Sequence, residues 1–211
     1  MWSDLPSLWQ ASCEDCPPIG AVVVGPEGEI RTRGRNRISA EKKPEGRNGA
    51  ARALAEGEAL RRLDLDAVDP HAGTLLTSTE PCPMRLRTFS ISGLRALQFT
   101  ARDPYAGSTN RLGTTWHLDH KAIQLVGPVN QTEIPFGVLL VEQELNHHAG
   151  RLTEEVFWGR YLEVLPEAIR AEYTLFQAEI VRALQDEHPP ACQLFDQLTA
   201  AAAAGVEGDQ P

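Results

Sequence analysis

The sequence contains little cysteine and no long apolar run. Four cysteines among 211 residues are too few for a disulfide scaffold. No apolar run approaches the length of a membrane-spanning helix, and no basic segment followed by an apolar stretch begins the chain as a signal peptide would. We therefore expect reduced thiols, a cytoplasmic location and no membrane partner.

Basic residues are outnumbered by acidic ones, and the formal net charge is −9. Affinity for nucleic acid comes largely from Lys and Arg that displace counterions, so we expect no nucleic-acid partner. The imbalance is uneven, because residues 1–121 carry 16 basic and 15 acidic side chains, whereas residues 122–211 carry 4 and 14. This step predicts a compact N-terminal domain followed by a differently built C-terminal region.

Strand-like and helix-like segments alternate over the first 150 residues. Apolar, β-branched runs bounded by turn residues predict strands at 19–24, 29–33, 74–78, 96–100 and 122–126, with helices at 4–12, 50–63, 83–93 and 137–147. This alternation predicts one three-layer α/β domain over residues 1–150. Helical patterns at 153–165 and 166–185 predict a helical extension over 151–199, and the alanine-rich, acidic residues 200–211 are expected to be disordered.

A carboxylate interrupts the apolar face of the helix predicted at 50–63. Ala53, Glu56, Leu60 and Leu63 fall on one stripe. A buried, unpaired carboxylate would cost several kcal/mol, so Glu56 is expected to meet a cation, a metal or strong hydrogen-bond donors. The alternative is a rotated helix on which Glu56 is solvated.

A second group of chemistry-bearing residues lies in the string Thr-Glu-Pro-Cys-Pro-Met-Arg at residues 79–85, between a predicted strand and a predicted helix. The prolines at 81 and 83 are typical of a helix start. Cys82 then lies at the first-turn amides, where a thiolate is favoured. Arg85, three residues later, projects from the same side of the helix as Cys82.

Together these segments resemble the cytidine/deoxycytidylate deaminase superfamily, and within it the branch that deaminates tRNA adenosine, guanine and cytosine. The resemblance covers about residues 19–148 in order and spacing, and it implies a three-layer α/β/α fold with a mixed sheet of about five strands. The matching segments are residues 19–24, 34–37, 55–60, 77–84 and 101–107.

In that superfamily an H-x-E motif and a P-C-x-x-C motif hold zinc, and the Glu moves protons while a zinc-activated water attacks the ring carbon that carries the amine. The resemblance places Glu56 at the proton-shuttling position and Cys82 at one zinc-ligand position. Leu54 and Arg85 stand at the two other ligand positions. We therefore expect no metal, and hypothesise that the Arg85 guanidinium takes the vacated zinc position and pairs with Glu56; the alternative is that Arg85 turns to solvent.

The resemblance also implies a small nucleobase or nucleoside ligand, bound by Asn36, Glu80 and Asp103, and a homodimer or larger assembly. Three readings of function remain open: a zinc-free, non-catalytic binder or partner subunit; an active hydrolytic deaminase with a rebuilt zinc site; and an interaction module that uses the acidic C-terminal helices. Weak candidates for rebuilding a site are Cys13 with Cys16, His117 with His120, and His147 with His148. The remaining cysteine, Cys192, is interpreted as a small apolar residue.

Overall fold

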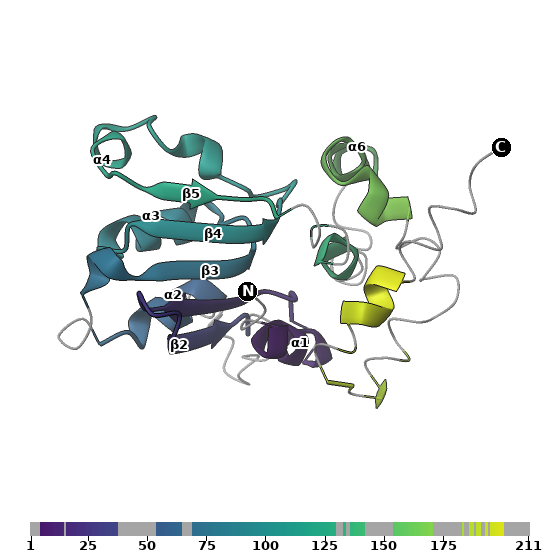
Figure 1. The fold of residues 1–211 in the computed structure, drawn as a ribbon. Helices are drawn as coiled ribbons and strands as arrows, with labels where there is room; N and C mark the ends of the chain where they lie inside the picture. The colour runs from purple at the N-terminus through teal and green to yellow at the C-terminus, as the bar shows by residue number, and fades with distance from the viewer. Residues whose placement is uncertain are drawn as a thin grey trace, which may run out of the picture.

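The computed structural model describes residues 5–14, 16–37, 54–64, 69–129, 133, 136–141, 154–170, 183, 186, 187, 189, 190, 193 and 195–200. Within them, five strands form one sheet in the order β2-β1-β3-β4-β5 (Figure 1). The strands are β1 (Gly20–Val24), β2 (Ile30–Arg35), β3 (Thr74–Thr79), β4 (Ala96–Ala101) and β5 (Gln124–Val126).

The sheet is mixed, as predicted. β1 runs antiparallel to both β2 and β3, whereas β3 pairs with β4, and β4 with β5, in parallel. The first two strands form a hairpin, in which Gly25 N donates to Glu29 O at 2.9 Å and Gly28 supplies a φ of 82° in the turn.

One edge of this sheet collects the segments that the sequence singles out. Arg35 at the end of β2 lies opposite Gly20 at the start of β1, and Thr79 at the end of β3 lies opposite Ala101 at the end of β4. The carboxyl ends of β2, β3 and β4 therefore meet on one side, which we call the carboxyl edge. Ligands of open α/β sheets bind outside the carboxyl ends of the strands.

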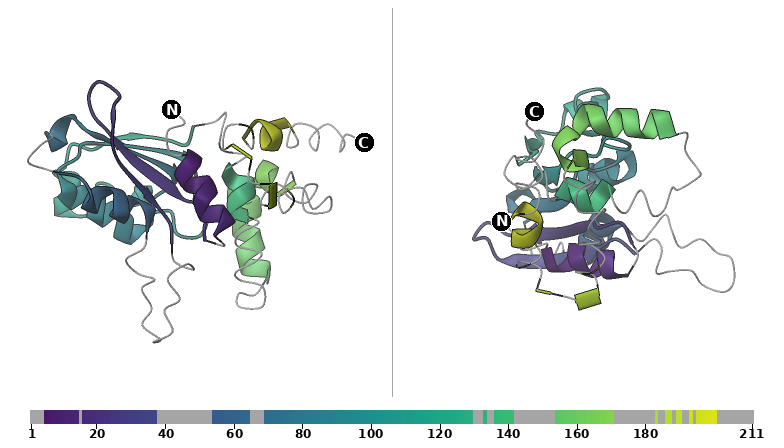
Figure 2. Two further views of the ribbon diagram at one scale, coloured as in Figure 1. Left: turned by 90° about the horizontal axis from the view of Figure 1, so that it is seen from below. Right: turned by 90° about the vertical axis from the view of Figure 1, so that its right-hand side faces the viewer.

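Helices lie on both sides of the sheet (Figure 2). They are α1 (Leu5–Cys13), α2 (Ala55–Arg61), α3 (Pro83–Ser92), α4 (Trp116–Asp119) and α6 (Glu154–Val164), with 3-10 turns at η2 (Pro70–Ala72) and η3 (Thr109–Arg111). α2 and α3 pack on one face, where Ala59 and Phe89 join an apolar cluster with Leu75 and Leu97 of the sheet. α1 packs against β1 and β2. The predicted three-layer α/β/α arrangement is confirmed.

C-terminal helical segments share an apolar cluster with α1. Leu8 and Trp9 of α1 are buried together with Phe136, Leu165 and Leu198. The helix predicted at 166–185 is helical over residues 166–170, and most of its remainder lies outside the described residues, as do residues 142–150 and 201–211. The division of the chain at residues 150 and 199 stays a prediction.

Among the described residues, no helix combines the length and the apolar character needed to cross a bilayer.

Close packing of β2 on α2 leads to the first prediction. A Cβ added at Gly34 would lie 2.0 Å from Ala55 O and 2.6 Å from Ala59 N. Because backbone atoms cannot yield like a flexible side chain, Gly34→Ala should lower the free energy of unfolding by about 1–3 kcal/mol, measured in urea. The matched control is Gly57→Ala within α2, where a Cβ meets nothing within 4 Å in the described part of the chain. That change should be neutral or stabilising, and equal losses in both variants would contradict the packing argument.

Candidate active site

Glu56 lies in the first turn of α2 and is fully buried, with 0% of its surface exposed. The prediction that the apolar stripe of this helix buries a carboxylate is confirmed, and the rotated-helix alternative is wrong. The hydroxyl of Thr77, on β3, donates to Glu56 Oε1 at 3.0 Å. Thr77 occupies an inward position of its strand, because it follows the buried Leu75 at the two-residue period of a strand. α2 and β3 therefore hold the carboxylate jointly.

The second carboxylate oxygen of Glu56 faces Arg85 of α3. Arg85 Nε lies 3.0 Å from Glu56 Oε2, and the Arg85 side chain is only 6% exposed. Neither atom is in a hydrogen bond, so the contact is an ion pair whose N–H is not aligned with the oxygen. The predicted pairing of Glu56 with Arg85 is confirmed, and the alternative of an Arg85 turned to solvent is wrong. The buried charge on α2 is thus balanced by a cation on α3.

Arg85 lies in the first turn of α3, and the start of this helix therefore sets where its side chain lies. Cys82 is the N-cap residue, with extended backbone, and Pro83 is the first helical residue, where its missing N–H costs nothing. Cys82 is half-buried and its thiol is free, and Leu54, the N-cap residue of α2, is buried with 7% exposure. These are the other two positions that the resemblance assigns to zinc ligands.

As a set of donors, Leu54, Cys82 and Arg85 do not fit a zinc ion. Catalytic zinc takes three protein ligands from Cys, His and carboxylates. Leu54 is a hydrocarbon, and a guanidinium is a permanent cation without a lone pair to offer. Cys82 is the single suitable donor of the three.

Glu80 fastens the loop that follows β4. Its Oε1 accepts from both the backbone N–H and the hydroxyl of Thr109, and its own N–H donates to Ala101 O at 2.8 Å. A Cβ at Gly107 would lie 2.4 Å from Glu80 Oε2 and 2.6 Å from the backbone oxygen of Asp103, and because the backbone oxygen cannot swing away, glycine suits this position. The same loop is held to the segment just before α3 by Ser108, whose hydroxyl donates to Pro81 O at 2.7 Å. Glu80 therefore lies at the carboxyl edge, with one oxygen committed to the loop.

Asp103 lies in the same loop, within electrostatic range of Arg85 and Glu80. Its Oδ1 accepts from the backbone N–H groups of Tyr105 and Ala106, at 3.0 and 2.8 Å. Burial raises the pKa of the Asp103 carboxyl above its ordinary value and Glu80 adds to this, while the two backbone donors and the Arg85 charge act in the opposite direction. Asp103 is the group at this edge whose proton affinity the fold most clearly raises.

This shift predicts a pH dependence of stability. Because the folded-state pKa lies above the unfolded value of about 3.9, protonated Asp103 favours the fold at low pH, and that contribution is lost as the pH rises through the folded-state pKa. The amide introduced by Asp103→Asn would keep both backbone hydrogen bonds, since a single oxygen accepts them. The unfolding free energy of the wild type should therefore fall relative to that of the variant between acidic and neutral pH. Urea titrations at several pH values measure this difference, and a difference that stays constant would refute it.

Asn36, the remaining predicted site residue, is fully buried just beyond β2, and its backbone N–H donates to Ile19 O at 2.9 Å. It lies at the carboxyl edge with Glu80 and Asp103, because the three residues follow β2, β3 and β4. Their predicted role in ligand binding stays a prediction.

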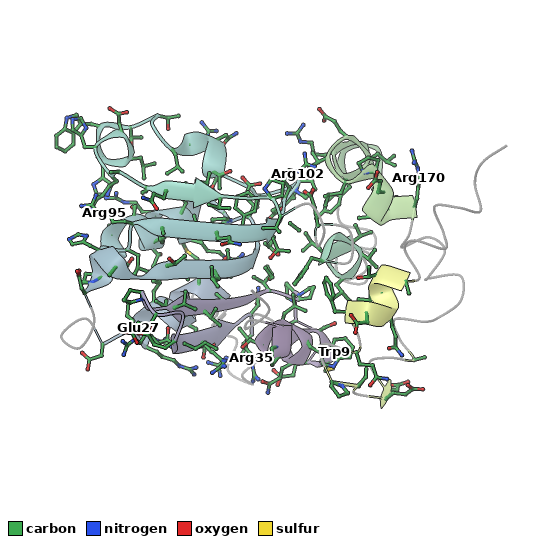
Figure 3. All side chains as sticks on the ribbon, in the orientation of Figure 1. Trp9, Glu27, Arg35, Arg95, Arg102 and Arg170 are labelled. Carbon is green, nitrogen blue, oxygen red and sulfur yellow. The ribbon has the colours of Figure 1, made fainter. Side chains whose placement is uncertain are left out.

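Sequence reasoning missed a second buried carboxylate on α2. Glu58 is 3% exposed, pairs with Arg37 and with Arg62 Nη2, and accepts from Arg35 N at 3.0 Å. Arg35, labelled in Figure 3, is in turn 3.0 Å from Glu14 Oε1, just beyond α1. The i,i+4 spacing of Glu58 and Arg62 was the available signal. These arginines thus hold helices to the sheet.

The weaker metal candidates do not converge in the described residues. Cys13 is partly buried, Cys16 is buried, and burial raises the pKa of the Cys13 thiol. His120 stacks on Trp116 with ring centroids 4.3 Å apart. No group of three His, Cys, Asp or Glu side chains in the described part of the chain is placed to hold a metal ion. His147, His148 and Cys192 lie outside it.

We compared the chain with protein-family models, with curated proteins and with solved structures. No protein-family model matches the chain, and no curated protein matches it. Among solved structures, guanine deaminase from Nitrosomonas europaea is 25% identical, with a TM-score of 0.51 over 66% of this chain and 79% of that one. A structure in complex with 2,6-diaminopurine is 24% identical, with a TM-score of 0.53 over 71% and 80% of the two chains. A deaminase for A-to-I editing at the tRNA wobble position is 26% identical, with a TM-score of 0.47 over 58% and 92%.

The two likenesses with TM-scores above 0.5 agree with the mixed five-stranded sheet and the helices on both of its sides. The chain therefore has the fold of the cytidine deaminase superfamily and is a deaminase-like protein.

Proposed function

We propose that this chain binds a nucleobase or nucleoside at the carboxyl edge and does not deaminate it by zinc chemistry. The observation that carries the proposal is the buried ion pair of Glu56 with Arg85, in which Arg85 stands at a position where the superfamily has a zinc ligand.

The energetics support this proposal. Bound zinc lowers the pKa of water from about 15.7 to about 7, which corresponds to about 12 kcal/mol in the availability of hydroxide at neutral pH. A carboxylate alone does not replace that contribution. Glu56 is also already engaged on both oxygens, by the Thr77 hydroxyl and by Arg85. A proton shuttle needs an oxygen that faces the reacting atoms.

The ligand class is supported by the fold and by the side chains at the carboxyl edge. A guanine deaminase is among the solved structures that share this fold. Asn36, Glu80 and Asp103 place an amide and two carboxylates at the carboxyl edge. Such groups pair with the polar edge of a heterocyclic base. A purine base is therefore the first ligand to test.

The test combines zinc content with activity. The full chain, purified without a metal-binding tag, should contain no zinc and should release no ammonia from cytosine, adenine, guanine or their nucleosides beyond a Glu56→Gln control. Glu56→Gln keeps the side-chain volume and the hydrogen bond to Thr77. One zinc per chain, with ammonia release that Glu56→Gln abolishes, would overturn the proposal in favour of an active deaminase with a rebuilt metal site.

A further inference from the structure

The hydrogen-bond donors of the Glu56–Arg85 pair bear on which bases the chain binds, those with an exocyclic oxo group or those with an exocyclic amine. This step rests on the proposed function, that a base lies at the carboxyl edge. We propose that the chain prefers bases that carry an exocyclic oxo group to the matching bases that carry an amine. Hypoxanthine, xanthine and uracil are thus preferred to adenine, guanine and cytosine. These ligands have the structure of deamination products rather than of deamination substrates.

The argument begins with which of the two side chains offers free hydrogen-bonding capacity. Glu56 is 0% exposed, so neither of its oxygens lies at the surface: Oε1 accepts from the Thr77 hydroxyl, and Oε2 lies beneath Arg85 Nε in the ion pair. Arg85 is 6% exposed and carries five N–H donors and no acceptor. Among the described residues, Glu56 is the one carboxylate in ion-pair contact with Arg85. The polar surface that this pair offers to a ligand therefore consists of donors.

The Arg85 guanidinium donors would favour an exocyclic oxo group over an exocyclic amine. In the superfamily, the zinc-bound water attacks the ring carbon that bears the exocyclic amine, so that group points toward the metal position. An amine there would present a donor to the donors of Arg85, and a buried donor would stay unpaired. An oxo group presents an acceptor, and a charge-assisted hydrogen bond forms.

The neighbouring carboxylates favour the same choice. In the oxo form of a base, the carbonyl lies beside a ring N–H, so this edge presents an acceptor next to a donor. In the amino form the order is reversed, with an NH₂ donor beside a ring nitrogen that accepts. The Asp103 carboxyl lies in the loop after β4, at the same carboxyl edge from which α3 begins, and its Oδ1 accepts from two backbone N–H groups. A donor from Arg85 and an acceptor from Asp103 thus match the edge of the oxo base.

The experiment compares three pairs of bases by calorimetric titration of the full wild-type chain at neutral pH. The pairs are hypoxanthine with adenine, xanthine with guanine, and uracil with cytosine. In the pair of bases that the site accepts, the oxo base should bind about tenfold more tightly or better, the effect of one buried donor satisfied or left unpaired. In Glu56→Gln/Arg85→Met, which removes both charges together, that preference should disappear.

The outcomes separate this inference from the proposed function. An amino base that binds as tightly as its oxo partner, or more tightly, would overturn the preference and leave the proposed binding function standing. Absence of binding by all six bases would overturn the proposed ligand class itself. A preference that persists unchanged in Glu56→Gln/Arg85→Met, with its fold verified by circular dichroism, would show that Arg85 is not its origin.

Discussion

Arg85→Met is expected to lower the free energy of unfolding by about 3–5 kcal/mol, because it leaves the Glu56 carboxylate buried without its cation. Methionine keeps most of the apolar length of the arginine and is a good helix former, so α3 itself should form normally. Urea unfolding followed by circular dichroism measures the effect. The loss would be among the largest that a single substitution causes in a domain of this size.

Two further variants test whether this loss of stability comes from the unpaired Glu56 carboxylate. Arg87→Met, at an exposed arginine on the same helix, should change the stability by less than about 0.5 kcal/mol. Glu56→Gln combined with Arg85→Met removes both charges and should recover most of the loss, since replacing a buried pair as a unit is often close to neutral. A double variant as unstable as Arg85→Met alone would mean that packing, and not the charge, explains the loss.

Zinc binding should be restored by Leu54→His combined with Arg85→Cys. These two changes, together with the native Cys82, complete the His, Cys and Cys donor set of the zinc deaminases. The variant is expected to bind one zinc per chain, and the wild type is expected to bind none. Elemental analysis of the purified proteins measures this, and a chelator should lower the thermal midpoint of the variant and not that of the wild type.

The matched control, Leu54→Ala combined with Arg85→Ala, removes the same two side chains without supplying donors and should bind no zinc. A folded His and Cys variant that is free of zinc would show that the starts of α2 and α3 do not bring the three positions together. That result would weaken the placement of Arg85 at the metal position, and with it the main support for the proposed function.

Much of the fold could be predicted because its elements are short and clearly bounded. The predicted strand at 74–78 and helix at 83–93 agree closely with β3 and α3, since turn residues and prolines mark their ends. α2 is observed over Ala55–Arg61, a shorter range than the prediction of 50–63, of which residues 50–53 lie outside the described residues. The burial of Glu56 could also be predicted, because the helical period alone places it on the apolar face.

The site itself was only partly predictable. The Glu56–Arg85 pair could be anticipated, since a buried carboxylate requires a partner and the resemblance places both residues at one centre. The hydrogen bonds from Thr77 to Glu56 and from Thr109 to Glu80 could not, because each joins residues that lie 21 or more positions apart in the chain and no motif links them. For Glu58 the spacing to Arg62 was a signal of the ion pair, but its burial depends on which face of α2 meets the sheet.

Local patterns in the sequence were therefore enough to predict the strands, the helices and a carboxylate that needs a cation. The period of a helix and the chemistry of a turn are properties of a few consecutive residues. The resemblance then pointed to Arg85 as that cation, whereas the other contacts of the site, such as the Thr77 hydroxyl on Glu56 and Thr109 on Glu80, depended on the tertiary structure. Only the antiparallel placement of β1 between β2 and β3, and the parallel pairing of β3 with β4, bring Asn36, Glu56, Arg85 and Asp103 to one edge of the sheet.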